Sequence, residues 1–369
     1  MNRLRRLSTE QGQSPWLDNL RRGWITGGQL KVLRDRGVRG LTSNPTIFQK
    51  AIQGSADYDT QFESLVRKKT DPVDAYWQLV LSDIDAALDV FAPVHAESGG
   101  ADGFVSVEVD PSLARDGAAT LAAARDLHER IARPNVMIKI PATEEGLPAI
   151  RQMIAEGRSV NVTLIFSLER YAAVLDAYIS GLEDRLAAGV HDLSNIASVG
   201  SFFISRVDTE VDRRLEKINT PAALALRGQA AIAQARLAYS LFRERHDGAR
   251  FRRVAVYGAR VQRPLWASTS TKNPAYRDTL YVDELIGPDT VNTLPDSTLE
   301  AFDDHGTLAR TIDAETGRAR QVWDALAVEG VDLVDVAAQL EREGVSSFQK
   351  SFDELIAALS TKAAALRSN

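Results

Sequence analysis

The sequence predicts an α/β fold in which strands alternate with helices. Short runs of β-branched residues recur along the chain, and longer alanine-rich stretches with apolar residues three and four positions apart separate them. This alternation is typical of parallel strands joined by helical crossovers. The eight candidate strands are Trp16–Asp18, Gly40–Thr42, Phe104–Val109, Val136–Ile140, Val160–Ile165, Ala197–Phe203, Pro264–Ser268 and Thr290–Leu294. Eight such units predict a TIM (β/α)8 barrel, whose functional side chains gather at the C-terminal ends of the strands.

Helical patterns fill the gaps between the candidate strands. They cover Asp74 to Val90, Ala114 to Ala132, Leu168 to Ala188 and Pro221 to Arg245. The two longest gaps, from Asn44 to Phe104 and from Phe203 to Pro264, are expected to hold extra helices rather than new domains. Arg253–Tyr257 also has the composition of a strand and is a further candidate.

The C-terminal part of the chain has an amphipathic helical pattern. It runs from about Asp313 to Asn369, with expected breaks near Gly330 and Gly344, and should pack on the barrel. No linker rich in proline, serine or glycine divides the chain, and no internal repeat is present. Residues 1–369 are therefore expected to form one barrel domain, with helical insertions and C-terminal helices from about residue 313.

Composition excludes several classes of function. The 369 residues are 44% hydrophobic and 25% charged, which is ordinary for a globular protein. A net charge of −6 without a basic block argues against nucleic acid as the main partner, and the absence of cysteine excludes thiol catalysis and disulfides. No apolar stretch follows the basic segment Met1–Ser8, and none reaches membrane-spanning length. A cytoplasmic location is expected.

Lys139 is the least expected residue of the fourth candidate strand. The run Val136–Ile140 otherwise has the composition of a buried strand. Because an ammonium group is costly to strip of water, such a lysine either reaches the surface or serves chemistry. Apolar surroundings lower the pKa of a lysine and make a neutral amine available to attack a carbonyl group. The alternative is an edge-strand lysine whose stem lies along an apolar surface.

Polar side chains on two other strands are predicted to face the barrel interior. Alternation in Phe104–Val109 places Ser106 and Glu108 on one face, where the carboxylate is either an acid/base group or a structural ion-pair partner. In the same way Asn161 and Thr163 share one face of their strand. Such a pair can bind hydroxyl groups or position a water molecule, although threonine is also a common strand residue.

The ends of three further strands offer candidate site residues. Asn44 lies in Thr42–Thr46, where a turn or a helix cap is the alternative reading. Asp18 is either an acid/base residue or a helix cap. Ser201 and Arg206 lie at a strand-to-helix junction, where backbone N–H groups and a guanidinium hold phosphate well.

The chain resembles the transaldolases, Schiff-base enzymes of the class I aldolase type from the pentose phosphate pathway. The resemblance extends from Trp16 to about Leu299, and it is closest to the longer bacterial members, which carry the Arg263–Thr269 segment and extra C-terminal helices. It implies a TIM barrel that acts on sugar phosphates and needs no cofactor or metal. The motifs that carry it, in the family's order, are Thr42–Thr46, Ser106–Asp110, Met137–Thr143, Asn161–Ser167 and Ser201–Arg206.

The resemblance also implies roles for individual residues. Lys139 corresponds to the lysine that forms the Schiff base. Glu108 corresponds to the glutamate that works through a water held by Thr163, and Asp18 to the aspartate that exchanges a proton with the C4 hydroxyl group. The residues implied for binding are Asn44 and Asn161 for the dihydroxyacetone hydroxyl groups, and Ser201 and Arg206 for the phosphate.

One position departs from the family pattern. Many members place an arginine in the segment after the seventh strand as a second phosphate ligand, whereas Ser268–Asn273 offers Lys272. Lysine supplies the charge without the bidentate fork of a guanidinium group.

The expected reaction transfers a dihydroxyacetone unit from sedoheptulose 7-phosphate to glyceraldehyde 3-phosphate, giving erythrose 4-phosphate and fructose 6-phosphate, in a monomer or homodimer. A related aldolase that releases free dihydroxyacetone would share Lys139, and the apolar Phe203 and the long insertions favour transfer over release. A non-catalytic barrel that only binds sugar phosphates is disfavoured, because it would tolerate the loss of Lys139, Glu108 and Thr163, and all three are present.

Overall fold

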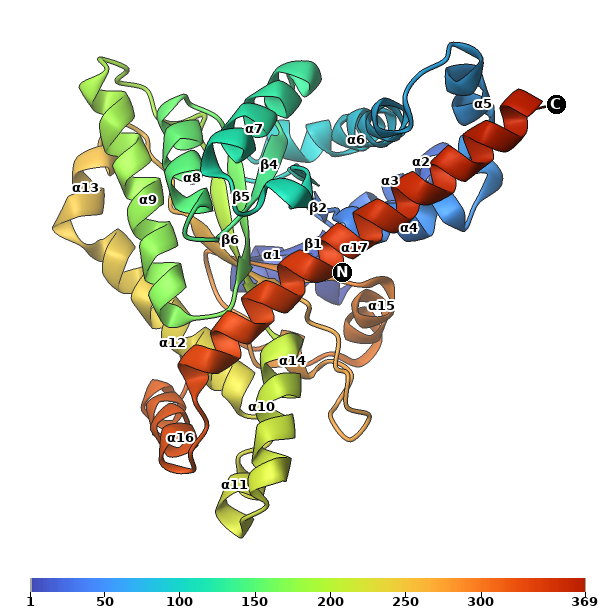
Figure 1. The fold of residues 1–369 in the computed structure, drawn as a ribbon. Coiled ribbons are helices and arrows are strands. Elements are labelled where there is room, and N and C mark those ends of the chain that lie inside the picture. The colour runs from blue at the N-terminus through green and yellow to red at the C-terminus, as the bar shows by residue number, and fades with distance from the viewer. Residues whose placement is uncertain (1, 369) are drawn as a thin grey trace.

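A closed barrel of parallel strands forms the centre of the protein. The computed structural model describes residues 2–368, and its eight strands follow one another around the barrel in chain order, with β1 paired to β8 (Figure 1). The strands are β1 (Gln13–Leu17), β2 (Leu41–Thr42), β3 (Val105–Glu108), β4 (Val136–Pro141), β5 (Val160–Ile165), β6 (Ser198–Phe203), β7 (Arg263–Ala267) and β8 (Thr290–Leu294). Each overlaps one of the eight predicted strands, so the predicted TIM barrel is confirmed.

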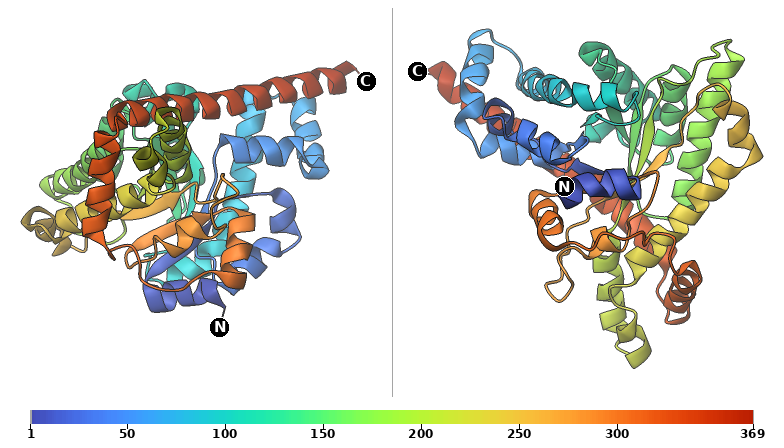
Figure 2. Two further views of the ribbon diagram at one scale, coloured as in Figure 1. Left: turned by 90° about the horizontal axis from the view of Figure 1, so that it is seen from below. Right: turned by 180° about the vertical axis from the view of Figure 1, so that it is seen from behind.

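Helices connect the strands and surround the barrel (Figures 1 and 2). The helices up to β6 are α1 (Arg3–Gln11), α2 (Arg22–Thr26), α3 (Gln29–Arg36), α4 (Pro45–Gln53), α5 (Asp59–Arg67), α6 (Pro72–Glu97), α7 (Gly117–Ile131), α8 (Gly146–Ala155) and α9 (Leu168–Ala187). The later helices are α10 (Ser205–Ile218), α11 (Pro221–Ala225), α12 (Ala230–Asp247), α13 (Ala249–Ala255), α14 (Leu280–Asp283), α15 (Asp296–His305), α16 (Thr316–Val328) and α17 (Leu333–Ser368). Short 3-10 turns are η1 (Ala56–Tyr58) and η2 (Pro111–Leu113).

The two long gaps between strands hold extra helices, as predicted. The helical pattern from Pro221 to Arg245 forms two helices, α11 and α12, with residues 226–229 between them. One local prediction is wrong. Arg253–Tyr257 is not a strand, because α13 continues to Ala255 and the chain then turns at Gly258, whose φ is 86°. Val254 is buried, whereas Val256 and Tyr257 at the helix end are 78% and 41% exposed.

The C-terminal segment forms α16 and the long helix α17. The predicted break at Gly330 is confirmed, whereas the break at Gly344 is absent, since α17 is continuous from Leu333 to Ser368. A Cβ atom at Gly344 would lie 2.9 Å from Leu164 Cδ2, so this glycine allows α17 to approach β5 closely. Met1 and Asn369, the ends of the predicted domain, lie outside the described residues.

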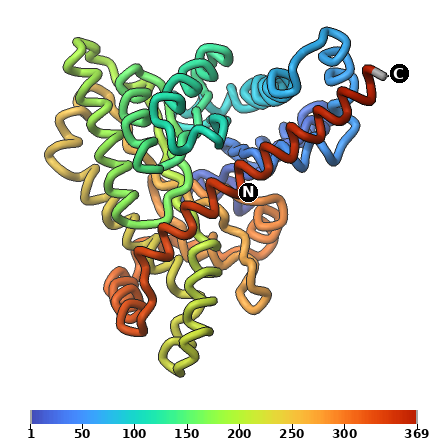
Figure 3. The backbone as a smooth tube through the Cα atoms, in the orientation of Figure 1, coloured from blue at the N-terminus to red at the C-terminus, as the bar shows by residue number. Residues whose placement is uncertain are grey.

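Helix α17 crosses the barrel at the C-terminal ends of the strands. It packs against α4, α5, α6 and α10 and reaches β5. Figure 3 follows it from beside α16 to the α5 region, and Figure 2 shows it along one edge of the molecule. Thr46 and Ser351 join α4 to α17 through their hydroxyl groups, 2.7 Å apart. One end of the barrel is therefore covered by a segment distant in sequence.

Strand register brings the polar side chains of β3, β4 and β5 to one level. Glu108 is paired with Lys139, and Lys139 with Asn161. A β-bulge between Val162 and Ile165 then interrupts the pairing of β5 with β6, and Leu164 adopts a φ of 60°, which is rare for a residue other than glycine. The chain within residues 2–368 forms no helix with the length and apolar character needed to cross a membrane.

Candidate active site

A cavity of about 130 Å³ lies at the C-terminal end of the barrel. Seven of the nine residues singled out in the sequence line it: Asp18, Asn44, Lys139, Thr163, Ser201, Arg206 and Lys272. The other two, Glu108 and Asn161, are buried in the adjoining strands β3 and β5. Residues far apart in the chain thus converge on one enclosed space, as the positions of the strand ends predict.

Lys139 and Glu108 form a buried ion pair. The Lys139 Nζ atom lies 3.1 Å from Glu108 Oε2 and donates a hydrogen bond of 2.8 Å to the carbonyl oxygen of Ser43. Both residues are 5% exposed. A carboxylate and a carbonyl group therefore face the ammonium group of Lys139, although the rest of its strand is apolar. The lysine is interior, which excludes the edge-strand alternative.

The carboxyl group of Glu108 is poised to accept a proton. Burial raises its pKa, and the nearby charge of Lys139 opposes that rise. Neither oxygen has a hydrogen-bond partner among residues 2–368 apart from this ion pair. A carboxylate with a raised pKa beside a lysine can take the proton that keeps the amine from acting as a nucleophile.

Asp18 follows β1 at the rim of the cavity. Its Oδ1 atom accepts a hydrogen bond of 2.8 Å from Thr42 Oγ1, and the hydroxyl groups of Thr42 and Thr293 are 2.6 Å apart. Burial raises the pKa of Asp18, whereas Lys139 and the Thr42 hydrogen bond lower it. The helix-cap alternative for Asp18 is excluded, because α2 begins after Arg21.

Asn44 has two functions in this geometry. Its Oδ1 atom caps α4 by accepting a hydrogen bond of 3.0 Å from the N–H group of Ile47, and Pro45 occupies the first helical position. The same residue lines the cavity. The cap predicted as the alternative is thus present, and it fixes the side chain at the cavity wall.

Thr163 and Asn161 differ in their surroundings although they share a strand face. Asn161 is fully buried, with Nδ2 donating to Ser106 Oγ at 3.0 Å and Oδ1 accepting from Ser201 Oγ at 2.7 Å. The Oγ1 atom of Thr163 is buried at the cavity and has no hydrogen-bond partner within the described chain. Because an unpaired buried hydroxyl group is costly, Thr163 has the properties of a residue that holds a water molecule or substrate.

Two cationic side chains, Arg206 and Lys272, also line the cavity. Arg206, the second residue of α10, places its guanidinium carbon 5.4 Å from the ring centroid of Phe203, and burial lowers its pKa. Lys272 lies in the loop after β7, and its Nζ atom donates to Ser270 Oγ at 2.6 Å. Partial burial and the charge of Arg206 lower the pKa of Lys272. Two neighbouring cations of this kind suit a phosphate group.

Several residues that line the cavity carry no sequence signal of a functional site. Phe348 comes from α17, and its position in an ordinary amphipathic pattern carries no signal that it reaches the barrel mouth. Thr42 lies in the motif Thr42–Thr46, but its hydrogen bond to Asp18 forms only because β1 and β2 are neighbours in the barrel. Ser268 has a φ of 57°, and its hydroxyl group lies 2.9 Å from that of Ser205.

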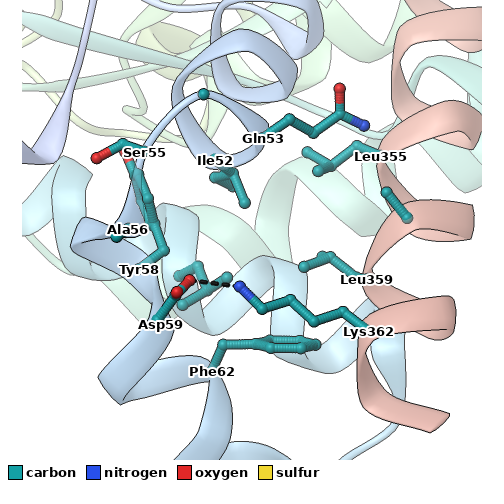
Figure 4. Close-up of a pocket in the computed structure, with 13 residues that line it drawn as sticks. Ile52, Gln53, Ser55, Ala56, Tyr58, Asp59, Phe62, Leu355, Leu359 and Lys362 are labelled. Carbon is teal, nitrogen blue, oxygen red and sulfur yellow. Dashed lines mark hydrogen bonds and ion pairs between the residues drawn. The ribbon is translucent and has the colours of Figure 1, made fainter. Parts of the chain in front are cut away.

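A larger cavity of about 490 Å³ lies between α4, α5 and α17 (Figure 4). Apolar side chains such as Phe62 and Leu359 form much of its wall, and Lys362 forms an ion pair with Asp59 across it. None of the nine candidate site residues lines this larger cavity, whereas seven of them line the smaller one. No group of side chains suited to a metal ion occurs between residues 2 and 368.

The fold and the site define a TIM-barrel enzyme with a buried lysine–glutamate pair at the carboxyl ends of its strands. The sequence model of the family described as Transaldolase/Fructose-6-phosphate aldolase matches residues 15–359. The chain belongs to this family.

Several bacterial proteins are similar over nearly the whole chain. A transaldolase of Saccharopolyspora erythraea is 51% identical over 350 residues, covering 94% of each chain. A transaldolase of Acidothermus cellulolyticus is 53% identical with the same coverage, and one of Mycobacterium ulcerans is 52% identical over 359 residues, or 96% of each chain.

Proposed function

We propose that the protein is a transaldolase that carries a three-carbon unit on Lys139. The observation that carries the proposal is the distance of 3.1 Å between Lys139 Nζ and Glu108 Oε2, at a cavity that Lys139, Arg206 and Lys272 all line. A nucleophilic amine and an anion-binding pair of cations around one cavity match a ketose phosphate. The family membership supports the same activity.

The first step joins the amine to the ketone of the donor sugar. Transfer of a proton from Lys139 to Glu108 frees the nitrogen lone pair, which attacks the carbonyl carbon and forms a C–N bond. The carbonyl oxygen is protonated and leaves as water, with Glu108 and a water held by Thr163 supplying and removing the protons. The product is an iminium group on Lys139.

The second step breaks the bond between C3 and C4. Asp18 takes the proton of the C4 hydroxyl group, the C4 oxygen becomes an aldehyde, and the bonding electrons move into the iminium group to give an enamine. The aldose phosphate leaves, and a second aldose phosphate enters. Reversal of the same steps joins the three-carbon unit to it and hydrolyses the Schiff base.

The polar residues around the cavity position the sugar. Asn44 and Ser201 line the cavity and bind hydroxyl groups of the three-carbon unit. Asn161 acts through Ser201, because it accepts a hydrogen bond from the Ser201 hydroxyl group. Arg206 and Lys272 bind the phosphate group. Phe203 and Phe348 add apolar surface to the cavity wall, which limits the entry of water.

The substrates are sedoheptulose 7-phosphate with glyceraldehyde 3-phosphate, and erythrose 4-phosphate with fructose 6-phosphate in the reverse direction. This reaction belongs to the non-oxidative pentose phosphate pathway and takes place in the cytoplasm. A single barrel domain carries it out, as a monomer or a homodimer.

Trapping of the covalent intermediate tests the proposal. Borohydride reduction in the presence of fructose 6-phosphate should fix a dihydroxyacetone adduct on Lys139, which peptide mass mapping locates. Lys139→Met should give no adduct, whereas Lys272→Met should still give one at saturating sugar. An unmodified Lys139 in the native protein would overturn the proposal.

A second measurement separates transfer from release of free dihydroxyacetone. With fructose 6-phosphate alone, a transaldolase stops after one three-carbon unit is bound to each active site, whereas an aldolase continues to turn over. Continued release of dihydroxyacetone without an acceptor aldehyde would assign the aldolase activity instead.

A further inference from the structure

The loop that carries Lys272 is held in place by side chains other than Lys272. It spans residues 268–279 between β7 and α14. The ammonium group of Lys272 donates to Ser270 within the same loop, so this contact does not fix the loop relative to the barrel. The position of the cation therefore depends on what anchors the loop.

One anchor is a buried carboxylate on α10. Asp212 is 7% exposed, and its Oδ2 atom accepts a hydrogen bond of 2.5 Å from the hydroxyl group of Tyr276, four residues after Lys272. Its Oδ1 atom accepts a hydrogen bond of 2.9 Å from the N–H group of Gly228. The carboxylate thus joins the loop to α10, the helix that also carries Arg206.

A second anchor repeats this arrangement one helical turn earlier. Asp208 is 1% exposed; its Oδ2 atom accepts from the hydroxyl group of Tyr281 at 2.6 Å, and its Oδ1 atom from the N–H group of Ala231 at 2.7 Å. Tyr281 lies on α14, where the loop ends. Both carboxylates lie outside the set of groups that takes part in the reaction steps.

The chain around Gly228 is shaped to receive Tyr276. Gly228 has a φ of 72°, and a Cβ atom there would lie 2.8 Å from Tyr276 Cζ. Any other residue would displace the ring, so glycine permits the close approach. The backbone at Gly228 therefore packs closely against the ring of Tyr276.

Electrostatic repulsion explains why such anchoring is needed. Arg206 and Lys272 are close enough for the charge of one to lower the pKa of the other. Like charges repel, so in the absence of a bound anion this repulsion opposes the close approach of the two cations. Hydrogen bonds from two tyrosines to carboxylates on α10 counteract that repulsion.

We infer that Asp212 and Tyr276 are positioning residues for phosphate recognition, because they fix the loop of Lys272 on the helix of Arg206 and so set the spacing of the two cations. This inference rests on the proposed function, since it assigns the phosphate group of the sugar to these cations. Asp208 and Tyr281 support the far end of the same loop.

Tyr276→Phe tests the inference with the loss of one oxygen atom. The KM for fructose 6-phosphate should rise about tenfold while kcat stays nearly constant, because a binding contact is weakened and the chemical groups are untouched. Inorganic phosphate, used as a competitive inhibitor, should lose affinity by the same factor. The matched control is Tyr178→Phe, which removes a hydroxyl group that donates to the carbonyl oxygen of Arg260 at 2.7 Å, away from the cavity.

A double-mutant cycle separates positioning from general loss of structure. In a Lys272→Met background, Tyr276→Phe should have no further effect on phosphate affinity, because the cation that it positions is gone. An unchanged KM in Tyr276→Phe, or an equal effect with and without Lys272, would overturn the inference. Direct titration with inorganic phosphate needs no turnover, so it tests the anchor even if the transferase activity is absent.

Discussion

Thr163 keeps a buried hydroxyl group that has no hydrogen-bond partner among residues 2–368. A buried hydroxyl group without a hydrogen bond destabilises the folded protein by about 1–3 kcal/mol. If Thr163 only had to form the strand, valine at this position would give a more stable protein. The bulge that begins after Val162 and the left-handed Leu164 show further departures from regular structure at this point. Such local costs are typical of functional sites.

We predict that Thr163→Val leaves stability unchanged or slightly higher and lowers kcat about a hundredfold, because the water that relays protons to Glu108 loses its holder. Steady-state kinetics and denaturant unfolding measure the two effects. As a control, Thr143→Val should lose stability while keeping activity, since Thr143 Oγ1 bonds to the carbonyl oxygen of Ala114 and the N–H group of Gly146. An active Thr163→Val variant would contradict the assignment.

The pKa of Asp18 depends on its hydrogen bond with Thr42. That bond favours the ionised carboxylate and lowers the pKa, so its loss in Thr42→Val should raise the pKa further above the ordinary value. Asp18 must be ionised to accept a proton from the donor sugar, and activity is lost as pH falls through its pKa. The acid limb of kcat/KM should therefore move to higher pH, by about half a unit to one unit.

The matched control for this pH profile is Thr293→Val. It removes the hydroxyl group that contacts Thr42 but leaves the bond from Thr42 to Asp18 intact. Its acid limb should stay where it is in the native protein. Equal profiles for all three proteins would show that another group controls the acid limb.

Helix α17 covers one end of the barrel and also contributes part of the cavity wall. Phe348 lines the cavity, and Phe352, one turn later, packs edge-on against Tyr76 with ring centroids 5.1 Å apart. Both phenylalanines are nearly buried, at 4% and 7% exposed. Phe348 lines the cavity and Phe352 does not, so substitution of each phenylalanine separates an effect on the site from a general effect on packing.

We predict that Phe348→Ala releases free dihydroxyacetone from fructose 6-phosphate without an acceptor, because water reaches the Schiff base through the opened wall. Phe352→Ala should lose a comparable free energy of unfolding, about 3–5 kcal/mol, without this release. A coupled assay for dihydroxyacetone measures the difference. Release from both variants, or from neither, would show that Phe348 does not exclude water.

At the scale of the whole molecule, His246 links acidity to stability. It is 6% exposed; its Nδ1 atom lies 2.9 Å from the carbonyl oxygen of Phe242, and its Nε2 atom accepts from the N–H group of Gln262 at 3.1 Å. This pattern fits only the neutral ring. Burial lowers the pKa of His246 from 6.5 to about 4.

Stability should fall as the solution is acidified. Below the unfolded pKa of 6.5 the unfolded chain binds a proton that the folded protein does not bind until about pH 4, so the free energy of unfolding decreases with falling pH. From pH 6.5 to about pH 5 the loss is about 2 kcal/mol. His246→Gln should lack this component in denaturant unfolding, whereas the exposed His305→Gln should retain it.

Much of the barrel and part of the site could be predicted, because both depend on local patterns. Strand alternation places Lys139 and Glu108 inside, and parallel register makes them neighbours. The same reasoning does not reveal Phe348, because helix periodicity shows which face is buried without showing what lies against it. Composition also wrongly predicts a strand at Arg253–Tyr257, because this segment forms the end of α13 and an exposed turn.

The placement of Phe348 has a consequence for biosynthesis. Residues 333–368 leave the ribosome after all eight strands have been made, so a nascent chain can assemble the barrel before the segment that encloses its lysine exists. A barrel in that state would lack the part of the cavity wall that Phe348 supplies. Docking of α17 therefore completes the cavity that separates the amine from adventitious carbonyl compounds.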